Sequence, residues 1–209
     1  MSYHDEQESL ESLKAWWGQW GNATTWLVLV VLVAGAGWNG WNYWQRHQAA
    51  EAAVLYDQVQ QAVDAGDKAK ITRIASDMED KFGGTAYGQM TALGAAKALY
   101  MAGDTAGAKA QLQWAADHAK DDEFRQIAKL RLASLLLDEK AYDQGLALLA
   151  EPQSDAFKGV VADGRGDLLA AQGKRDDART AYQLALASLP KNDTSTRQLV
   201  QFKLDALGG

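Results

Sequence analysis

The chain has 209 residues, with 21 Lys and Arg against 27 Asp and Glu, so its formal net charge at pH 7 is −6. It contains no cysteine, which excludes disulfides and thiol chemistry and is compatible with either redox compartment. It also lacks the run of basic residues that a nucleic-acid backbone attracts. We therefore expect no nucleic-acid partner.

An uncharged segment dominates the N-terminal part of the chain. No charged residue lies between Lys14 and Arg46, and a helix over residues 23–43 would be about 30 Å long, the thickness of the hydrocarbon core of a bilayer. Tryptophans flank this segment, as is typical of rings at a membrane–water interface. They are Trp16, Trp17, Trp20 and Trp26 toward its start, and Trp38, Trp41 and Trp44 toward its end. We predict a transmembrane helix over residues 23–44, embedded in a lipid bilayer.

A buried core helix and a cleaved signal peptide are the competing interpretations of this segment. Two aromatic girdles disfavour the core helix. A signal peptide needs a positive region just before the apolar run, but the first 25 residues hold Lys14 alone against four acids, namely Asp5, Glu6, Glu8 and Glu11. An uncleaved anchor is therefore favoured.

Residues 1–22 form an acidic and amphipathic N-terminal segment. We expect residues 1–9 to be disordered. The apolar residues that follow recur at helical spacing, which fits a helix lying in the membrane surface and an extension of the span equally well. Gly18, Gly21 and Asn22 predict a break before the span. The apolar stripe consists of Leu10, Leu13, Trp17 and Trp20.

Residues 45–209 carry a helical repeat. Four similar turns begin at Gly66, Gly103, Lys140 and Gly173, at spacings of 37, 37 and 33 residues. Each ends one helical pattern and opens another, with Gly or a polar substitute as the C-cap. A period near 34 residues with helix–turn–helix content is the signature of tetratricopeptide repeats. We predict an all-α chain with one transmembrane helix and a tetratricopeptide-like domain, closed by a last helix near residues 195–207.

No catalytic or metal-binding constellation is visible in the sequence. The three histidines, His4, His47 and His118, are scattered and lack metal-ligand spacing. We therefore expect no enzymatic activity, cofactor, metal or small-molecule substrate.

Two further motifs are candidates for contacts. Asp163, Arg165 and Asp167 form a polar cluster in an otherwise apolar helix. This cluster would either bind a peptide through Arg165 or form an Arg–Asp tie between repeats, and we favour the tie because Gly164 and Gly166 predict close helix packing. Within the span, Ala36 and Gly40 form a small-xxx-small step that would let another helix approach.

These features together resemble the YfgM family, the ancillary subunits of the bacterial SecYEG translocon. The resemblance covers residues 8–207 and is carried by several motifs. These are Gly37-Trp38-x-x-Trp41-x-x-Trp44-x-x-His47-Gln48, Tyr56-x-x-Val59, Tyr87-Gly88, Leu130-Arg131-Leu132-Ala133, Val161-Ala162-Asp163-x-Arg165-Gly166-Asp167-x-Leu169, Gly173, and Ala178-Arg179-x-Ala181-Tyr182.

The resemblance implies a single-pass protein of the bacterial inner membrane, with a cytoplasmic N-terminus and a periplasmic repeat domain. It also implies association with the SecYEG translocon and with the membrane-anchored periplasmic chaperone PpiD. Charge alone does not orient the span, because Lys14 on one side is matched by Arg46 on the other. We therefore expect a non-enzymatic translocon subunit that assists secretion. The alternatives are a membrane-anchored repeat scaffold for an envelope or division complex, and a reversed anchor with a cytoplasmic domain.

Overall fold

The computed structural model describes the backbone of residues 2–208 and the side chains of residues 14–208. The described part is helical, which confirms the all-α prediction. It divides into two compact units, Met1–Gln48 and Ala49–Gly209. The helices are α1 (Ser2–Asp64), α2 (Lys68–Phe82), α3 (Ala86–Met101), α4 (Thr105–His118), α5 (Asp122–Asp138), α6 (Tyr142–Leu148), α7 (Lys158–Ala171), α8 (Arg175–Ser188) and α9 (Thr194–Ala206), with a short 3₁₀ helix η1 (Asp155–Phe157) before α7.

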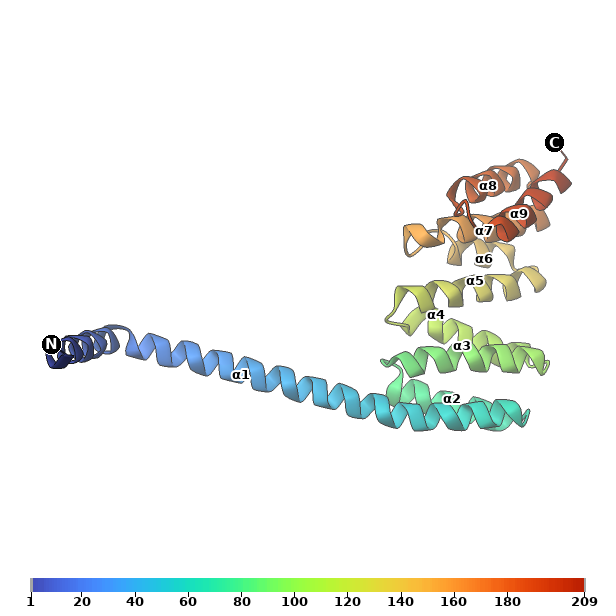
Figure 1. The fold of residues 1–209 in the computed structure, drawn as a ribbon. Helices are drawn as coiled ribbons and strands as arrows, with labels where there is room; N and C mark the ends of the chain where they lie inside the picture. The colour runs from blue at the N-terminus through green and yellow to red at the C-terminus, as the bar shows by residue number, and fades with distance from the viewer. Residues whose placement is uncertain (1, 209) are drawn as a thin grey trace. The chain divides into compact units, whose positions relative to one another are not determined.

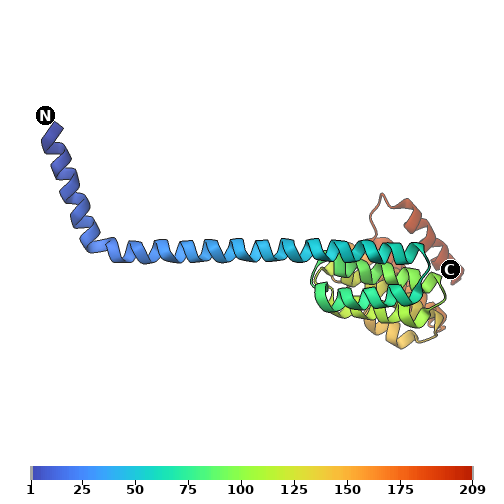
Figure 2. The ribbon, with the colours of Figure 1, turned by 90° about the horizontal axis from the view of Figure 1, so that it is seen from below.

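The first unit is a continuous helix, the N-terminal part of α1. Residues 2–9 are helical, so the expected disorder is wrong for them, and residue 1 lies outside the described part. The helix axis bends sharply before the long straight part of α1, which agrees with the break that the sequence predicts before the span (Figures 1 and 2). Gly21 also permits a close side-chain contact, because the ring of Trp17 lies 3.1 Å from the position that a Cβ would occupy there. The hydroxyl of Thr25 donates to the carbonyl of Gly21 at 2.8 Å, within the helix.

The predicted apolar segment lies on α1. In the described part of the chain, this is the one helix that is long and apolar enough to cross a membrane. Only 6% of its most apolar 18-residue stretch is buried within the protein. The side chains along it are exposed, Leu32 by 67% and Val33 by 65%, so the core-helix interpretation is wrong.

The second unit is a stack of antiparallel helix pairs, which confirms the tetratricopeptide-like prediction (Figures 1 and 2). The end of α1 joins the stack, since Val59 and Ala62 share a core cluster with Ile71 and Ile74 of α2. The further pairs are α3 with α4, α5 with α6, and α7 with α8. Helix α9 packs on α8 and closes the stack at the C-terminal end.

The core of the stack is continuous but has three parts. The largest lies among α1 to α5, and a second joins α7, α8 and α9. A smaller cluster of Ala133, Leu149, Val161 and Leu168 connects them. Many core positions are alanine, such as Ala95, which is fully buried. Small side chains let the helices approach closely, so each repeat depends on its neighbours for burial.

All four predicted repeat turns adopt the left-handed conformation. The φ angles are 66° at Gly66, 79° at Gly103, 60° at Lys140 and 78° at Gly173. In each turn the next N–H bonds back to a carbonyl five residues earlier, as Ala141 does to Leu136 at 2.8 Å. This is the bonding of a Schellman motif, which favours glycine because a Cβ is strained at positive φ. Lys140 is the one non-glycine residue at positive φ in the part of the chain that is described.

This difference predicts opposite effects of two substitutions at equivalent turns. Lys140→Gly removes the strain and should raise the free energy of unfolding by about 1 kcal/mol. Gly173→Ala introduces the same strain in open space and should lower it by about 1 kcal/mol. Urea unfolding of the full chain in detergent micelles, followed by circular dichroism, measures both. Shifts of the same sign would contradict this account of the turns.

Candidate functional site

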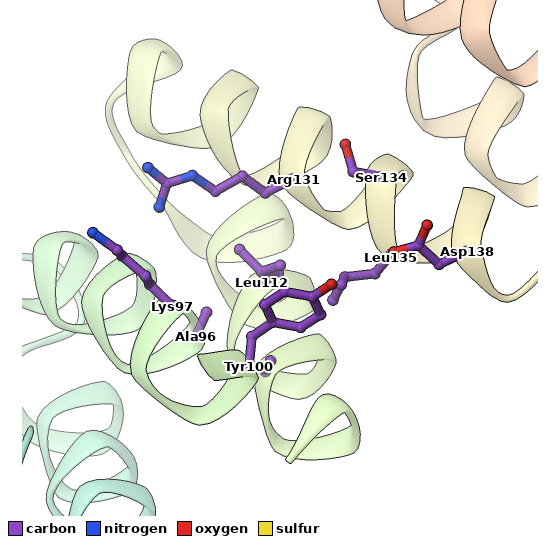
Figure 3. A pocket seen from close by; sticks show the side chains of 9 residues that line it. Ala96, Lys97, Tyr100, Leu112, Arg131, Ser134, Leu135 and Asp138 are labelled. Carbon is purple, nitrogen blue, oxygen red and sulfur yellow. The ribbon is translucent and has the colours of Figure 1, made fainter. Parts of the chain in front are cut away.

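The first helices of successive pairs line a groove on the repeat domain. A hollow of about 400 Å³ lies among α3, α4 and α5 (Figure 3). We call it the α3–α5 groove. A second hollow of about 220 Å³ lies between α5 and α7, and it shares Arg131 and Ser134 with the first. The α3–α5 groove is lined by Ala96, Lys97, Tyr100, Ala108, Leu112, Arg131, Ser134, Leu135 and Asp138.

The α3–α5 groove has an apolar floor and an uneven charge. Lys97 and Arg131 extend from facing helices at one end, and Asp138 lies at the other (Figure 3). Arg131 donates one long hydrogen bond, from a terminal guanidinium nitrogen to the carbonyl of Leu93 at 3.4 Å. Among the side chains of residues 14–208, neither cation forms an ion pair with a carboxylate. Tyr100 lies between the two ends and is 48% exposed.

Beyond α5, charged side chains on the same face contact one another. The Lys203 ammonium of α9 lies 2.9 Å from a carboxylate oxygen of Asp163 and 2.8 Å from one of Asp167. The Tyr182 hydroxyl donates to Asp167 at 2.8 Å. These side chains of α7, α8 and α9 form a terminal tie that joins the last helix to the stack.

Burial and mutual charge shift the pKa values in this tie. Burial raises the pKa of Asp163, the hydrogen bond from Lys203 opposes that rise, and the charge of Asp167 adds to it. Burial by itself lowers the pKa of Lys203, but the hydrogen bonds to both carboxylates outweigh it and the net shift is upward. Lys203 therefore stays protonated, and two half-buried carboxylates share one cation.

Arg165 does not take part in this tie, so the expected Arg–Asp contact is wrong. Asp163 and Asp167 are four residues apart and share one face of α7, whereas Arg165 points away from that face. Its guanidinium donates to the carbonyls of Leu146 and Leu149, at 3.4 and 3.2 Å, at the C-terminal end of α6. Arg165 thus satisfies carbonyls that the helix leaves without an intrahelical partner.

The glycines beside Arg165 permit close helix contact, as the sequence predicts. A Cβ at Gly166 would overlap the ring of Tyr182, and one at Gly164 would lie 3.0 Å from a methyl carbon of Leu149. Helices α7 and α8 therefore pack closely where Gly166 faces Tyr182.

Several residues with clear roles were not predicted from the sequence. The buried side chains of Gln89 and Gln126 accept hydrogen bonds from the backbone N–H groups of Asp121 and Gln153, at 3.0 and 2.9 Å. The two glutamines are 37 residues apart, the same spacing as the turns, and that spacing was an available signal.

The groove residues also follow the period of the repeat. Lys97, Ser134 and Asp167 each lie six residues before a turn residue, at Gly103, Lys140 and Gly173 respectively. Aligning the repeats on their turns therefore identifies this face of the domain from the sequence. Lys203 carries no such signal, because its partners become clear only when α9 is placed on α7.

The residues predicted for the membrane and for helix packing lie on α1, in the first unit. Gly40 has open space around its Cβ position, and Ala36 is exposed. Trp41 and Trp44 contact one another with ring centroids 5.3 Å apart. The seven tryptophans are 48–72% exposed, namely Trp16, Trp17, Trp20, Trp26, Trp38, Trp41 and Trp44. Their contacts with lipid and the helix-packing role of Ala36 and Gly40 stay predictions.

The terminal tie predicts a pH-dependent effect of Lys203→Met. Without the ammonium, Asp163 and Asp167 repel one another in a half-buried site, which should cost about 2 kcal/mol of unfolding free energy at pH 7. The pKa of Asp163 is already raised, so the folded protein binds that proton more tightly than the unfolded chain. Protonation of Asp163 therefore stabilises the folded protein at low pH. This stabilisation is lost as the pH rises through the pKa of Asp163 in the folded state.

The deficit of Lys203→Met should therefore shrink as the pH falls toward 4, where Asp163 takes up a proton. Urea unfolding of the full chain in micelles at pH 7 and pH 4 measures it. Lys191→Met removes an exposed cation and serves as the matched control. An equal deficit at both pH values would contradict the proposed repulsion.

The fold and the groove define a helical-repeat protein of the tetratricopeptide class. The family model for a tetratricopeptide repeat-like domain matches residues 14–209. The chain is 31% identical over 156 residues to a protein of Neisseria gonorrhoeae named Ancillary SecYEG translocon subunit, covering 75% of this chain and 74% of that protein. It is 29% identical over 102 residues to an Escherichia coli protein of the same name, covering 49% of this chain and 50% of the relative. The chain belongs to this family, the YfgM family, whose members are of a non-enzymatic kind.

Proposed function

We propose that this chain is a non-enzymatic ancillary subunit of the SecYEG translocon in the bacterial inner membrane. The observation that carries the proposal is the shared name of the two relatives, Ancillary SecYEG translocon subunit. Two features of the chain support it. One helix exposes an apolar surface long enough to cross a bilayer, and a repeat domain follows that helix.

The proposed mechanism is positional. The span over residues 23–44 confines the repeat domain to the membrane surface beside the translocon, which raises its effective concentration near emerging chains. The repeat domain then supplies the protein contacts. The family resemblance makes the membrane-anchored periplasmic chaperone PpiD a proposed partner. We assign contact with the translocon itself to the span, its flanks, or both. Within the span, Ala36 and Gly40 offer a place for another helix.

Site-specific photo-crosslinking in native membranes tests the partners. We expect a probe at Ala36 to form adducts with translocon subunits, and a probe at Tyr100 in the groove to form adducts with secretory chaperones or exported chains. A probe at Gln183, which is exposed on α8 outside the groove, is the control and should give few adducts. Mass spectrometry identifies the adducts. Division or cell-wall proteins without any translocon component would favour the scaffold alternative.

The proposed topology places the N-terminus in the cytoplasm and the repeat domain in the periplasm. Because the natural chain has no cysteine, single substitutions report orientation without background. We expect a membrane-impermeant maleimide to label Asp176→Cys, on an exposed position of α8, in intact spheroplasts. Ser9→Cys in the N-terminal segment should react only after the membrane is permeabilised. The reverse pattern would show a cytoplasmic repeat domain.

A further inference from the structure

The α3–α5 groove presents positive charge that has no carboxylate partner among the side chains of residues 14–208. Lys97 and Arg131 lie at one end of it on neighbouring helices (Figure 3), in a chain whose net charge is −6. Elsewhere on the same face, the ammonium of Lys203 contacts both Asp163 and Asp167. The pair at the α3–α5 groove is thus complementary to an anionic group from outside the chain.

The floor beside this pair is suited to an apolar side chain. Leu112 and Leu135 are 3% and 7% exposed, and the ring of Tyr100 lies across the open side. A hollow of about 400 Å³ holds a few side chains of an extended segment and is too small for a packed helix. Asp138 at the far end disfavours a second acidic group there (Figure 3). The groove therefore selects both the charge and the direction of its occupant.

We propose that the α3–α5 groove binds an extended segment of a partner protein that carries a carboxylate next to an apolar side chain. The carboxylate lies between Lys97 and Arg131, and the apolar side chain packs on Leu112, Leu135 and Tyr100. This inference rests on the proposed function in one respect, that the repeat domain binds proteins. It adds the chemical class of the segment and the residues that select it.

The test uses two fluorescein-labelled peptides of ten residues, one alternating glutamate with leucine and one alternating lysine with leucine. Binding to the full chain in nanodiscs is followed by fluorescence anisotropy at low and high salt. We expect the glutamate peptide to bind, and to bind more weakly at high salt because the charges are exposed and screened. The lysine peptide should bind at least about tenfold more weakly, since like charges meet at the groove.

A matched pair of double variants assigns the binding to the groove. Lys97→Gln with Arg131→Gln should weaken the glutamate peptide about tenfold, because both charge-assisted contacts are lost. Lys109→Gln with Lys129→Gln makes the same change in net charge at a second hollow of about 400 Å³, among α4, α5 and α6. That control should leave the affinity unchanged. Equal weakening by both pairs, or equal binding of the two peptides, would overturn the proposal.

Failure of the groove proposal can be distinguished from failure of the proposed association with the translocon. The Ala36 probe should still crosslink to translocon subunits in the Lys97→Gln and Arg131→Gln double variant. Loss of peptide selectivity with that crosslink intact would overturn the groove proposal alone. A Tyr100 probe that crosslinks mainly to a second copy of this chain, with no binding of the glutamate peptide, would also overturn it in favour of self-association.

Discussion

The exposed apolar surface of α1 is the constraint on which the rest of the structure depends. From Trp26 to Val33 every side chain is at least 49% exposed, although each apolar square ångström removed from water is worth about 25 cal/mol. A globular protein does not leave such a surface in water without a partner. The hydrocarbon core of a bilayer is the partner that we propose. A helix needs no further polar contacts there, because its backbone hydrogen bonds are all internal.

In the described residues, α9 covers the last helix pair of the repeat domain. It does so with Val200, which is fully buried, and with Lys203, which reaches the carboxylates of α7. In this terminal tie, Lys203 pairs with Asp163 and Asp167, the carboxylates of α7 on the same face as the groove. On the same face, Lys97 and Arg131 form no such ion pair among the side chains of residues 14–208.

The periodic features of this fold were predictable, and the contacts between distant repeats were not. Turns at Gly66, Gly103 and Gly173 follow from local chemistry, because glycine tolerates positive φ, and the same spacing places Lys140 at the one strained turn. The Asp163 cluster was visible as a polar patch, but its partner was not, because Lys203 lies 40 residues away and reaches Asp163 only through the packing of α9. Aligning the repeats on their turns identifies Lys97, but Arg131 lies at a different position of its repeat. The contact between Gly21 and the ring of Trp17 was not predicted, because a glycine in the sequence does not show which side chain occupies the space beside it.

The central claim is that the apolar helix places a protein-binding repeat domain beside the translocon. A cryo-electron microscopy reconstruction of SecYEG purified with this chain from native membranes tests it most directly. The account predicts density for residues 23–44 within the bilayer beside the channel, and the repeat domain at its periplasmic mouth with the α3–α5 groove accessible. A complex that lacks the chain, or a repeat domain on the cytoplasmic side, would contradict it.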